Sequence, residues 1–262
     1  MRSLLVLAAL AAAAPIAAHE MVSVASRPAV TQSFLIFDTG EVRPQAIALL
    51  YTGGGGRLGL RREEGELKFR PHNFLVRAAP ELARNGVLPV AMDAPSDQQE
   101  LTDEYRRGAE QSADARAVLR ELKHRFPGLP VYLVGTSRGT ISAAVLGSEL
   151  GDEVAGVVLT STMFGSSNPR RQVPNLRGFD YGAIRVPLLF VHHRDDACQH
   201  TPYASAARLA GRFALISVSG GKPAESGPCE PYAAHGYFGR EAETAAAIAA
   251  WMRGRPFAKD IE

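Results

Sequence analysis

Val131-Tyr-Leu-Val-Gly-Thr-Ser-Arg-Gly-Thr140 contains the most informative motif of this chain. An apolar run leads directly into the pattern Gly-x-Ser-x-Gly, and a helix-compatible segment follows to Leu150. A serine at the tip of a sharp strand-to-helix turn exposes its hydroxyl group, and flanking glycines leave room for the neighbouring strand or helix. The stretch therefore predicts a buried strand, a turn that presents Ser137, and a helix whose N-terminus faces that serine.

Buried-strand patterns recur along the chain and alternate with helix-like segments. Continuous apolar runs are typical of strands that are buried on both faces of a sheet. The predicted strands are residues 33–38, 46–51, 87–92, 131–134, 154–160, 186–191 and 212–218. The predicted helices are residues 73–84 (interrupted at Pro80), 102–126, 140–150 and 241–253, with loops at 57–71 and 164–184. This alternation predicts an α/β fold, with a mostly parallel sheet, helices on both faces, and a single domain over residues 19–262.

Composition and charge narrow the classes of function. Of the 262 residues, 46% are hydrophobic, which is enough for a sizeable core. The formal net charge is +2 and no basic run occurs. The sequence therefore gives no indication of nucleic-acid binding.

The first residues differ in composition from the rest of the chain. Arg2 precedes an apolar run from Leu4 to Ala14, which ends in small residues before His19. This order is typical of a secretory signal peptide over residues 1–18, with cleavage expected near Ala18. Because the apolar run is too short to span a bilayer comfortably, a retained membrane anchor is only the alternative. We expect a secreted or periplasmic protein.

The chain has two cysteines, Cys198 and Cys229. In an exported protein these two residues are expected to form a disulfide, and two free thiols are the alternative.

A glycine run, Gly53 to Gly56, follows the predicted strand 46–51. Consecutive glycines let the backbone approach a ligand closely with its amides uncovered. After an early strand of this fold such amides can stabilise a developing oxyanion, although a flexible surface loop is the alternative for the glycine run alone.

A serine hydroxyl becomes a good nucleophile only when a base takes its proton, and the base needs a group that orients it. In this architecture the acid and then the base follow the serine in the chain. Asp195 and Asp196 come directly after the strand 186–191, and Asp196 is preferred, with Asp195 as the alternative. His235 is the histidine that follows the last predicted strand, so it is the candidate base.

Taken together, these residues make the chain resemble an α/β-hydrolase over essentially the whole mature sequence. The resemblance implies that Ser137 is the nucleophile, His235 the general base and then acid, and Asp196 the orienting carboxylate. It also implies an oxyanion hole formed by the amide of Arg138 and by that of Gly54 or Gly55. Lipases of the His-Gly-Gly-Gly type carry a histidine where this chain has Thr52, which leaves the choice of glycine amide open.

The positions of the cysteines gain a meaning from this assignment. Cys198 lies two residues after Asp196, and Cys229 lies six residues before His235. A disulfide between them would tie the loop of the acid to the loop of the base and restrict their separation.

Two weaker signals have structural alternatives. A cluster of possible zinc ligands comprises His192, His193, Asp195, Asp196 and His200. Adjacent strand residues point to opposite faces, so we expect no metal site and no cofactor. The Arg138 guanidinium either favours an anionic substrate or makes a salt bridge, and the salt bridge is the expectation.

The sequence thus predicts an exported serine hydrolase that cleaves carboxylic esters, small or polymeric, through an acyl-enzyme. Amide or peptide hydrolysis and acyl transfer are alternatives on the same triad, and a non-catalytic binding protein of this fold is a third. Only residues 161–185 are available where many α/β-hydrolases insert a helical lid, so a minimal lid or none is expected. The sequence does not indicate an oligomeric state.

Overall fold

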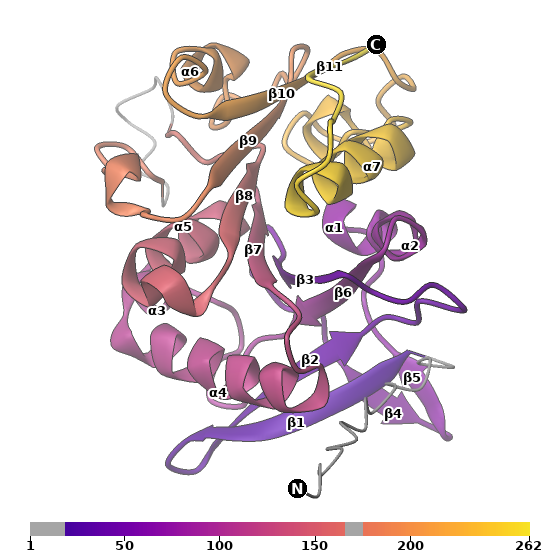
Figure 1. Cartoon of the computed structure of the whole chain (residues 1–262), viewed down its shortest axis with the longest axis vertical. Coiled ribbons are helices and arrows are strands. Elements are labelled where there is room, and N and C mark those ends of the chain that lie inside the picture. The colour runs from indigo at the N-terminus through magenta and orange to yellow at the C-terminus, as the bar shows by residue number, and fades with distance from the viewer. Residues whose placement is uncertain (1–18, 166–174) are drawn as a thin grey trace, which may run out of the picture.

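A nine-stranded sheet forms the centre of the part of the chain that the computed structural model describes, residues 19–165 and 175–262 (Figure 1). The strand order is β1-β2-β6-β3-β7-β8-β9-β10-β11. The β1–β2 and β2–β6 pairs are antiparallel, and all later neighbours are parallel. The strands are β1 (Glu20–Arg27), β2 (Val30–Ile36), β3 (Ala46–Tyr51), β6 (Val87–Met92), β7 (Val131–Thr136), β8 (Gly156–Thr160), β9 (Leu188–His193), β10 (Ala214–Val218) and β11 (Asp260–Ile261).

The central strands are buried on both faces, which explains their continuous apolar sequences. Every residue of β3 is buried. Ile47 and Leu49 pack into the hydrophobic core on one face, and Ala48 and Leu50 pack into the core on the other. A strand in this position has no solvent-facing side, so it shows no polar alternation.

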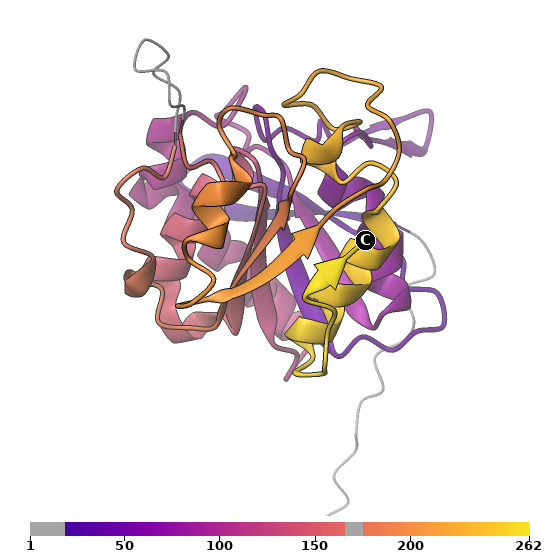
Figure 2. The same cartoon turned by 90° about the horizontal axis from the view of Figure 1, so that it is seen from above.

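Helices cover the sheet on both faces, with one group on each side in the view from above (Figure 2). One face carries α3 (Asp103–Arg107), α4 (Ala109–Arg125) and α5 (Gly139–Leu150). The other face carries α1 (Phe74–Arg77), α2 (Ala79–Arg84) and α7 (Glu241–Met252), and the short α6 (Tyr203–Ala207) lies near β9. The predicted α/β architecture is confirmed.

Several local predictions differ from the structure. Residues 57–71 are not only loop, because they contain a hairpin of β4 (Arg61–Glu63) and β5 (Glu66–Lys68). The helix predicted over 102–126 is divided at Gly108, whose extended backbone begins α4. The sequence reading also missed β1, α6 and β11. β1 is an edge strand that is mostly half-buried, so it lacks the continuous apolar run of the central strands.

The described residues between β8 and β9 contain little regular structure. Its described residues form one short 3-10 helix, Tyr181–Ala183, and no longer helix that would act as a lid. The predicted signal peptide, residues 1–18, lies outside the described residues. Within the described ranges, no helix has the length and apolar character needed to cross a membrane.

A buried ion pair fastens the edge strand β1 to α4. Arg27 donates from Nε to Asp114 Oδ1 at 2.9 Å and from Nη2 to Asp114 Oδ2 at 3.0 Å. The side chain of Asp114 is only 1% exposed, and it also accepts a hydrogen bond from Tyr105. Asp97 accepts two further bonds from the Arg27 guanidinium at the surface.

We predict that Arg27→Ala destabilises the fold by about 3 kcal/mol, because it leaves the Asp114 carboxylate buried without its cation. Chemical denaturation measures the free energy of unfolding. Arg116→Ala is the matched control, since Arg116 pairs with Glu153 at the surface and should change the stability by less than about 1 kcal/mol. Equal effects of the two substitutions would contradict the prediction.

Candidate active site

The turn between β7 and α5 holds Ser137 in a strained backbone conformation with φ of +51°. The flanking glycines have no space for a side chain. A Cβ atom at Gly139 would lie 2.0 Å from Tyr51 O at the end of β3, and one at Gly135 would lie 2.5 Å from Gly139 O. The spacing of the Gly-x-Ser-x-Gly pattern therefore follows from backbone contacts in the turn.

The candidate base and acid are in contact. His235 Nδ1 lies 3.1 Å from Asp196 Oδ2, and the Asp196 side chain is fully buried. Asp195 instead has a side chain that is 69% exposed and lies 3.8 Å from His193. Of the two aspartates that the sequence offered, the structure brings Asp196 to His235.

Thr201 is a further member of this cluster, and the sequence reading missed it. Its hydroxyl donates to Asp196 Oδ2 at 2.7 Å and lies 3.2 Å from His235 Nδ1. The other carboxylate oxygen, Asp196 Oδ1, accepts a hydrogen bond from the amide of Cys198. Both oxygens are thus occupied and the carboxylate is fixed in orientation, which no motif in the sequence indicates.

A second layer of hydrogen bonds holds the backbone of His235. The Ser161 hydroxyl donates to His235 O at 2.8 Å. Tyr237 is fully buried, and its hydroxyl donates to Val191 O at 2.6 Å and accepts from Ser161 N at 3.0 Å. Ser161 and Tyr237 both have positive φ, of 45° and 56°. Such strain persists where surrounding contacts determine the conformation, and it is frequent at functional sites.

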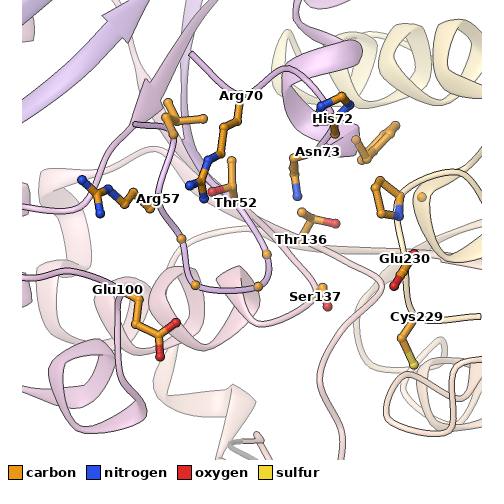
Figure 3. A pocket seen from close by; sticks show the side chains of 18 of the residues that line it. Thr52, Arg57, Arg70, His72, Asn73, Glu100, Thr136, Ser137, Cys229 and Glu230 are labelled. Carbon is orange, nitrogen blue, oxygen red and sulfur yellow. The ribbon is translucent and has the colours of Figure 1, made fainter. Parts of the chain in front are cut away.

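Ser137 and His235 line one cavity of about 580 Å³ (Figure 3). Its lining also includes the glycine run, Asn73 and Cys229. No hydrogen bond joins Ser137 to His235, and Ser137 Oγ lies 3.9 Å from Met163 Sδ. Catalytic hydrogen bonds are often long in free enzymes and tighten with substrate, so this separation is compatible with a working pair.

Backbone amides are available on both sides of the serine. The amide of Gly56 donates to Gly53 O, whereas among the described residues no acceptor is found for the amides of Gly53, Gly54, Gly55 and Arg138. Gly53 packs against the serine, since a Cβ atom there would lie 3.0 Å from Ser137 Cβ. A Cβ atom at Gly55 would lie 3.0 Å from Glu100 Oε2. The choice between the amides of Gly54 and Gly55 stays a prediction.

Two arginines place positive charge beside the glycine run. Arg106 is completely buried and donates to Gly54 O, Leu101 O and Ser142 Oγ. Burial, and next the like charge of Arg138, lower the pKa of Arg106 to about 9. The salt bridge expected for Arg138 is not found among the described residues, and its Nε is buried without a hydrogen-bond partner.

The remaining members of the histidine-rich cluster have separate partners. His192 Nε2 accepts from the amide of Thr162, so the neutral ring carries its proton on Nδ1. His193 contacts Gly220 O through Nε2 and accepts from Asp195 N through Nδ1. Within the described residues, no group of three or more potential ligands is arranged to hold a metal ion.

The predicted disulfide between Cys198 and Cys229 is present. It joins the loop that carries Asp196 to the segment that leads into His235. Cys229 also lines the cavity, so this cross-link forms part of the wall beside the candidate triad.

Comparisons with known proteins agree with this fold. A family model described as serine aminopeptidase, S33, matches residues 73–179. An α/β serine hydrolase without lid from Xanthomonas campestris has a TM-score of 0.58 at 16% identity, covering 92% of this chain and 98% of that chain. Est1E from Butyrivibrio proteoclasticus has a TM-score of 0.58 at 14% identity, covering 89% and 98%. A Pyrococcus furiosus esterase has a TM-score of 0.53 at 16% identity, covering 77% and 82%. No curated protein matches the chain.

The sheet order, the serine turn and these likenesses agree on the fold. The chain has the α/β-hydrolase fold, and residues 73–179 match the serine aminopeptidase model. The predicted fold is confirmed, and the neighbour from Xanthomonas campestris is itself described as having no lid.

The disulfide generates a prediction about stability and reactivity. Replacing both cysteines by serine should lower the free energy of unfolding by about 3 kcal/mol, because the bridge closes a loop with a sequence separation of 31. It should also slow the reaction of Ser137 with a fluorophosphonate, since the loops of Asp196 and His235 lose their tie. Denaturation and labelling rates measure the two effects, and wild-type protein treated with a reductant should behave like the variant. Unchanged stability and labelling would contradict the role assigned to the bridge.

His192 gives the site a pH-dependent stability. Burial lowers the pKa of His192 to about 3, although the charge of Asp196 acts in the opposite direction. In the unfolded chain the pKa returns to about 6.5, so between these values only the unfolded state takes up the proton. Stability should therefore fall as the pH decreases below about 6.5, by up to about 1.4 kcal/mol per pH unit from this group.

Denaturation of wild type and His192→Gln between about pH 4 and 7 tests this contribution. The variant should lose part of the pH dependence, whereas His124→Gln, at an exposed position of α4, should retain it. Parallel curves for wild type and His192→Gln would be evidence against a buried neutral His192.

Proposed function

We propose that the protein is an exported serine hydrolase that cleaves carboxylic esters. One observation carries the proposal: Ser137 and His235 line the same cavity, and His235 is hydrogen-bonded to the buried carboxylate of Asp196. A serine with a histidine oriented by a carboxylate is the arrangement that acyl transfer to a hydroxyl requires.

In the proposed first step, Ser137 Oγ attacks the ester carbonyl while His235 Nε2 takes the hydroxyl proton. The ring can present Nε2 to the serine because Nδ1 faces Asp196 Oδ2 at 3.1 Å. The negative charge that develops on the carbonyl oxygen is stabilised by the amide of Arg138, at the N-terminus of α5, and by that of Gly54 or Gly55. The imidazolium then protonates the leaving alcohol.

In the proposed second step, His235 removes a proton from water, which attacks the acyl-enzyme and releases the acid. Through both steps Asp196 stabilises the protonated imidazole, and Thr201 with the amide of Cys198 holds that carboxylate. The exposed residues at the cavity lining, such as His72, leave it accessible to water.

Export is part of the proposal. Its support is the signal-like composition of residues 1–18, together with the disulfide between Cys198 and Cys229. Disulfides persist in the periplasm and outside the cell, where thiols are not kept reduced.

An amide is the second candidate for the bond that the protein cleaves. The Pyrococcus furiosus protein is named as an esterase, which supports an ester, but the matching family model is described as a serine aminopeptidase, which favours an amide. Rates on matched esters and 4-nitroanilides with the same acyl group separate the two candidates. Added alcohol would reveal acyl transfer through a new ester product.

Fluorophosphonate labelling followed by peptide mapping is the direct test of the proposal. We expect an adduct on Ser137, and we expect Ser137→Ala or His235→Ala to lower kcat by roughly 10⁴ or more. Ser148→Ala, on α5, is the matched control and should keep the activity. No adduct on folded, oxidised protein would contradict the proposal and favour a binding protein.

The two aspartates provide a second matched pair. Asp196→Asn should lower kcat by roughly 10⁴, because the amide no longer orients and stabilises the imidazolium. Asp195→Asn should have little effect, since its side chain is exposed and contacts His193 instead. Similar losses in both variants would argue against this assignment of the acid.

A further inference from the structure

The cavity beside Ser137 carries two arginines without a carboxylate partner. Arg57 and Arg70 both line it, and both lie on the same side of the glycine run in Figure 3. Neither side chain forms an ion pair or a hydrogen bond within the described residues. Many other arginines of the described chain do have a carboxylate partner, namely Arg27, Arg61, Arg77, Arg84, Arg107, Arg116, Arg125, Arg194 and Arg240.

The backbone that presents these two arginines is fixed. The buried carboxylate of Asp93 accepts hydrogen bonds from the amides of Leu58, Gly59 and Leu60. The amide of Arg70 donates to Leu58 O at 2.9 Å, which holds the end of the hairpin against the same segment. Both guanidinium groups therefore extend from ordered backbone next to the glycine run, and not from a free loop.

The acidic residues of the cavity have other interactions. Glu230 accepts a hydrogen bond from the amide of Gly227, within its own loop. Glu100 lies against Gly55, and its charge favours the protonated form of the buried Arg106. In Figure 3, Glu100 lies on the opposite side of the glycine run from Arg70, and Glu230 lies beside Cys229. Within the described residues, neither glutamate forms an ion pair with Arg57 or Arg70.

A second hollow, of about 380 Å³, adjoins these arginines. Arg57 and Arg70 line it as well, together with Arg61 and polar residues such as Ser33 and Ser96. Asp93 also lines it, and its carboxylate already accepts hydrogen bonds from the amides of Leu58, Gly59 and Leu60. The two guanidinium groups therefore stand where the cavity of Ser137 meets a polar hollow.

We infer that Arg57 and Arg70 form a subsite for an anionic group, and that the substrate is an ester that carries a carboxylate. This inference rests on the proposed function and adds a substrate class to it. Guanidinium groups bind carboxylates through paired, charge-assisted hydrogen bonds. The carboxylate belongs either to the acyl part or to the alcohol part of the ester, and the two probes below distinguish these cases.

The acyl probe compares 4-nitrophenyl hemisuccinate with 4-nitrophenyl levulinate, which replaces the carboxylate by an uncharged methyl ketone of similar shape. The alcohol probe compares 4-carboxyphenyl acetate with 4-carbamoylphenyl acetate. Rates are corrected for spontaneous hydrolysis, and each pair gives a ratio of kcat/KM for the anionic over the neutral ester. Because the paired compounds differ in intrinsic reactivity, the change of this ratio between protein variants is the decisive quantity.

One of the two ester pairs carries its carboxylate on the part of the ester that the subsite binds. For that pair, Arg57→Gln/Arg70→Gln should lower the ratio of kcat/KM by about tenfold, mainly through KM. The ratio for wild type should also fall as salt is added, because exposed charges are screened. Arg120→Gln and Arg43→Gln together are the matched control, since they remove the same two charges from exposed arginines outside the cavity and should leave both ratios unchanged.

An unchanged ratio for both pairs in the double variant would overturn the inference, as would a rise in the ratio on removing the arginines. The labelling of Ser137 by a fluorophosphonate is measured in the same preparations. If Ser137 is labelled but the ratios do not change, only the anionic subsite is rejected. If wild-type protein is not labelled at Ser137, the proposed hydrolase itself is rejected.

Discussion

The close contact between the start of α5 and the end of β3 is the constraint on which the site depends. A Cβ atom at Gly139 would lie 2.0 Å from Tyr51 O, so the helix can approach the strand only through glycine. This approach sets the turn that holds Ser137 at φ of +51° and brings Gly53 against the serine. Ser137 and the glycine run are therefore positioned by backbone packing, before any side chain contributes.

His235 is held independently of the serine, and from several directions. Asp196 and Thr201 fix its ring, while the Ser161 hydroxyl binds its carbonyl oxygen. Gly236 allows the next turn, since a Cβ atom there would lie 2.0 Å from Pro231 O. Because these contacts come from loops after β8, β9 and β10, the histidine position is a property of the whole carboxyl edge of the sheet.

The sequence predicted what local patterns encode. Buried strands such as β3 and β6 agree with the structure to the residue, because burial on both faces leaves an unbroken apolar run. The serine turn follows a motif with a steric cause, and the candidate acid and base were predicted from their order after the serine in the chain. Thr201 and Tyr237 could not be predicted, because their hydroxyl groups act through contacts between loops that are distant in the chain. The edge strand β1 was missed for a related reason, since only part of it is buried.

Arg106 places a buried positive charge beside the glycine run. A fully buried guanidinium without a carboxylate partner is costly, and its lowered pKa reflects that cost. Within the described residues, its hydrogen bonds go to uncharged acceptors: Gly54 O in the glycine run, Leu101 O before α3, and Ser142 Oγ on α5. One side chain thereby cross-links the elements that surround the candidate oxyanion hole. In the proposed reaction its charge, together with the N-terminus of α5, provides a positive potential where the carbonyl oxygen becomes negative, so that no solvent reorganisation is needed at that moment.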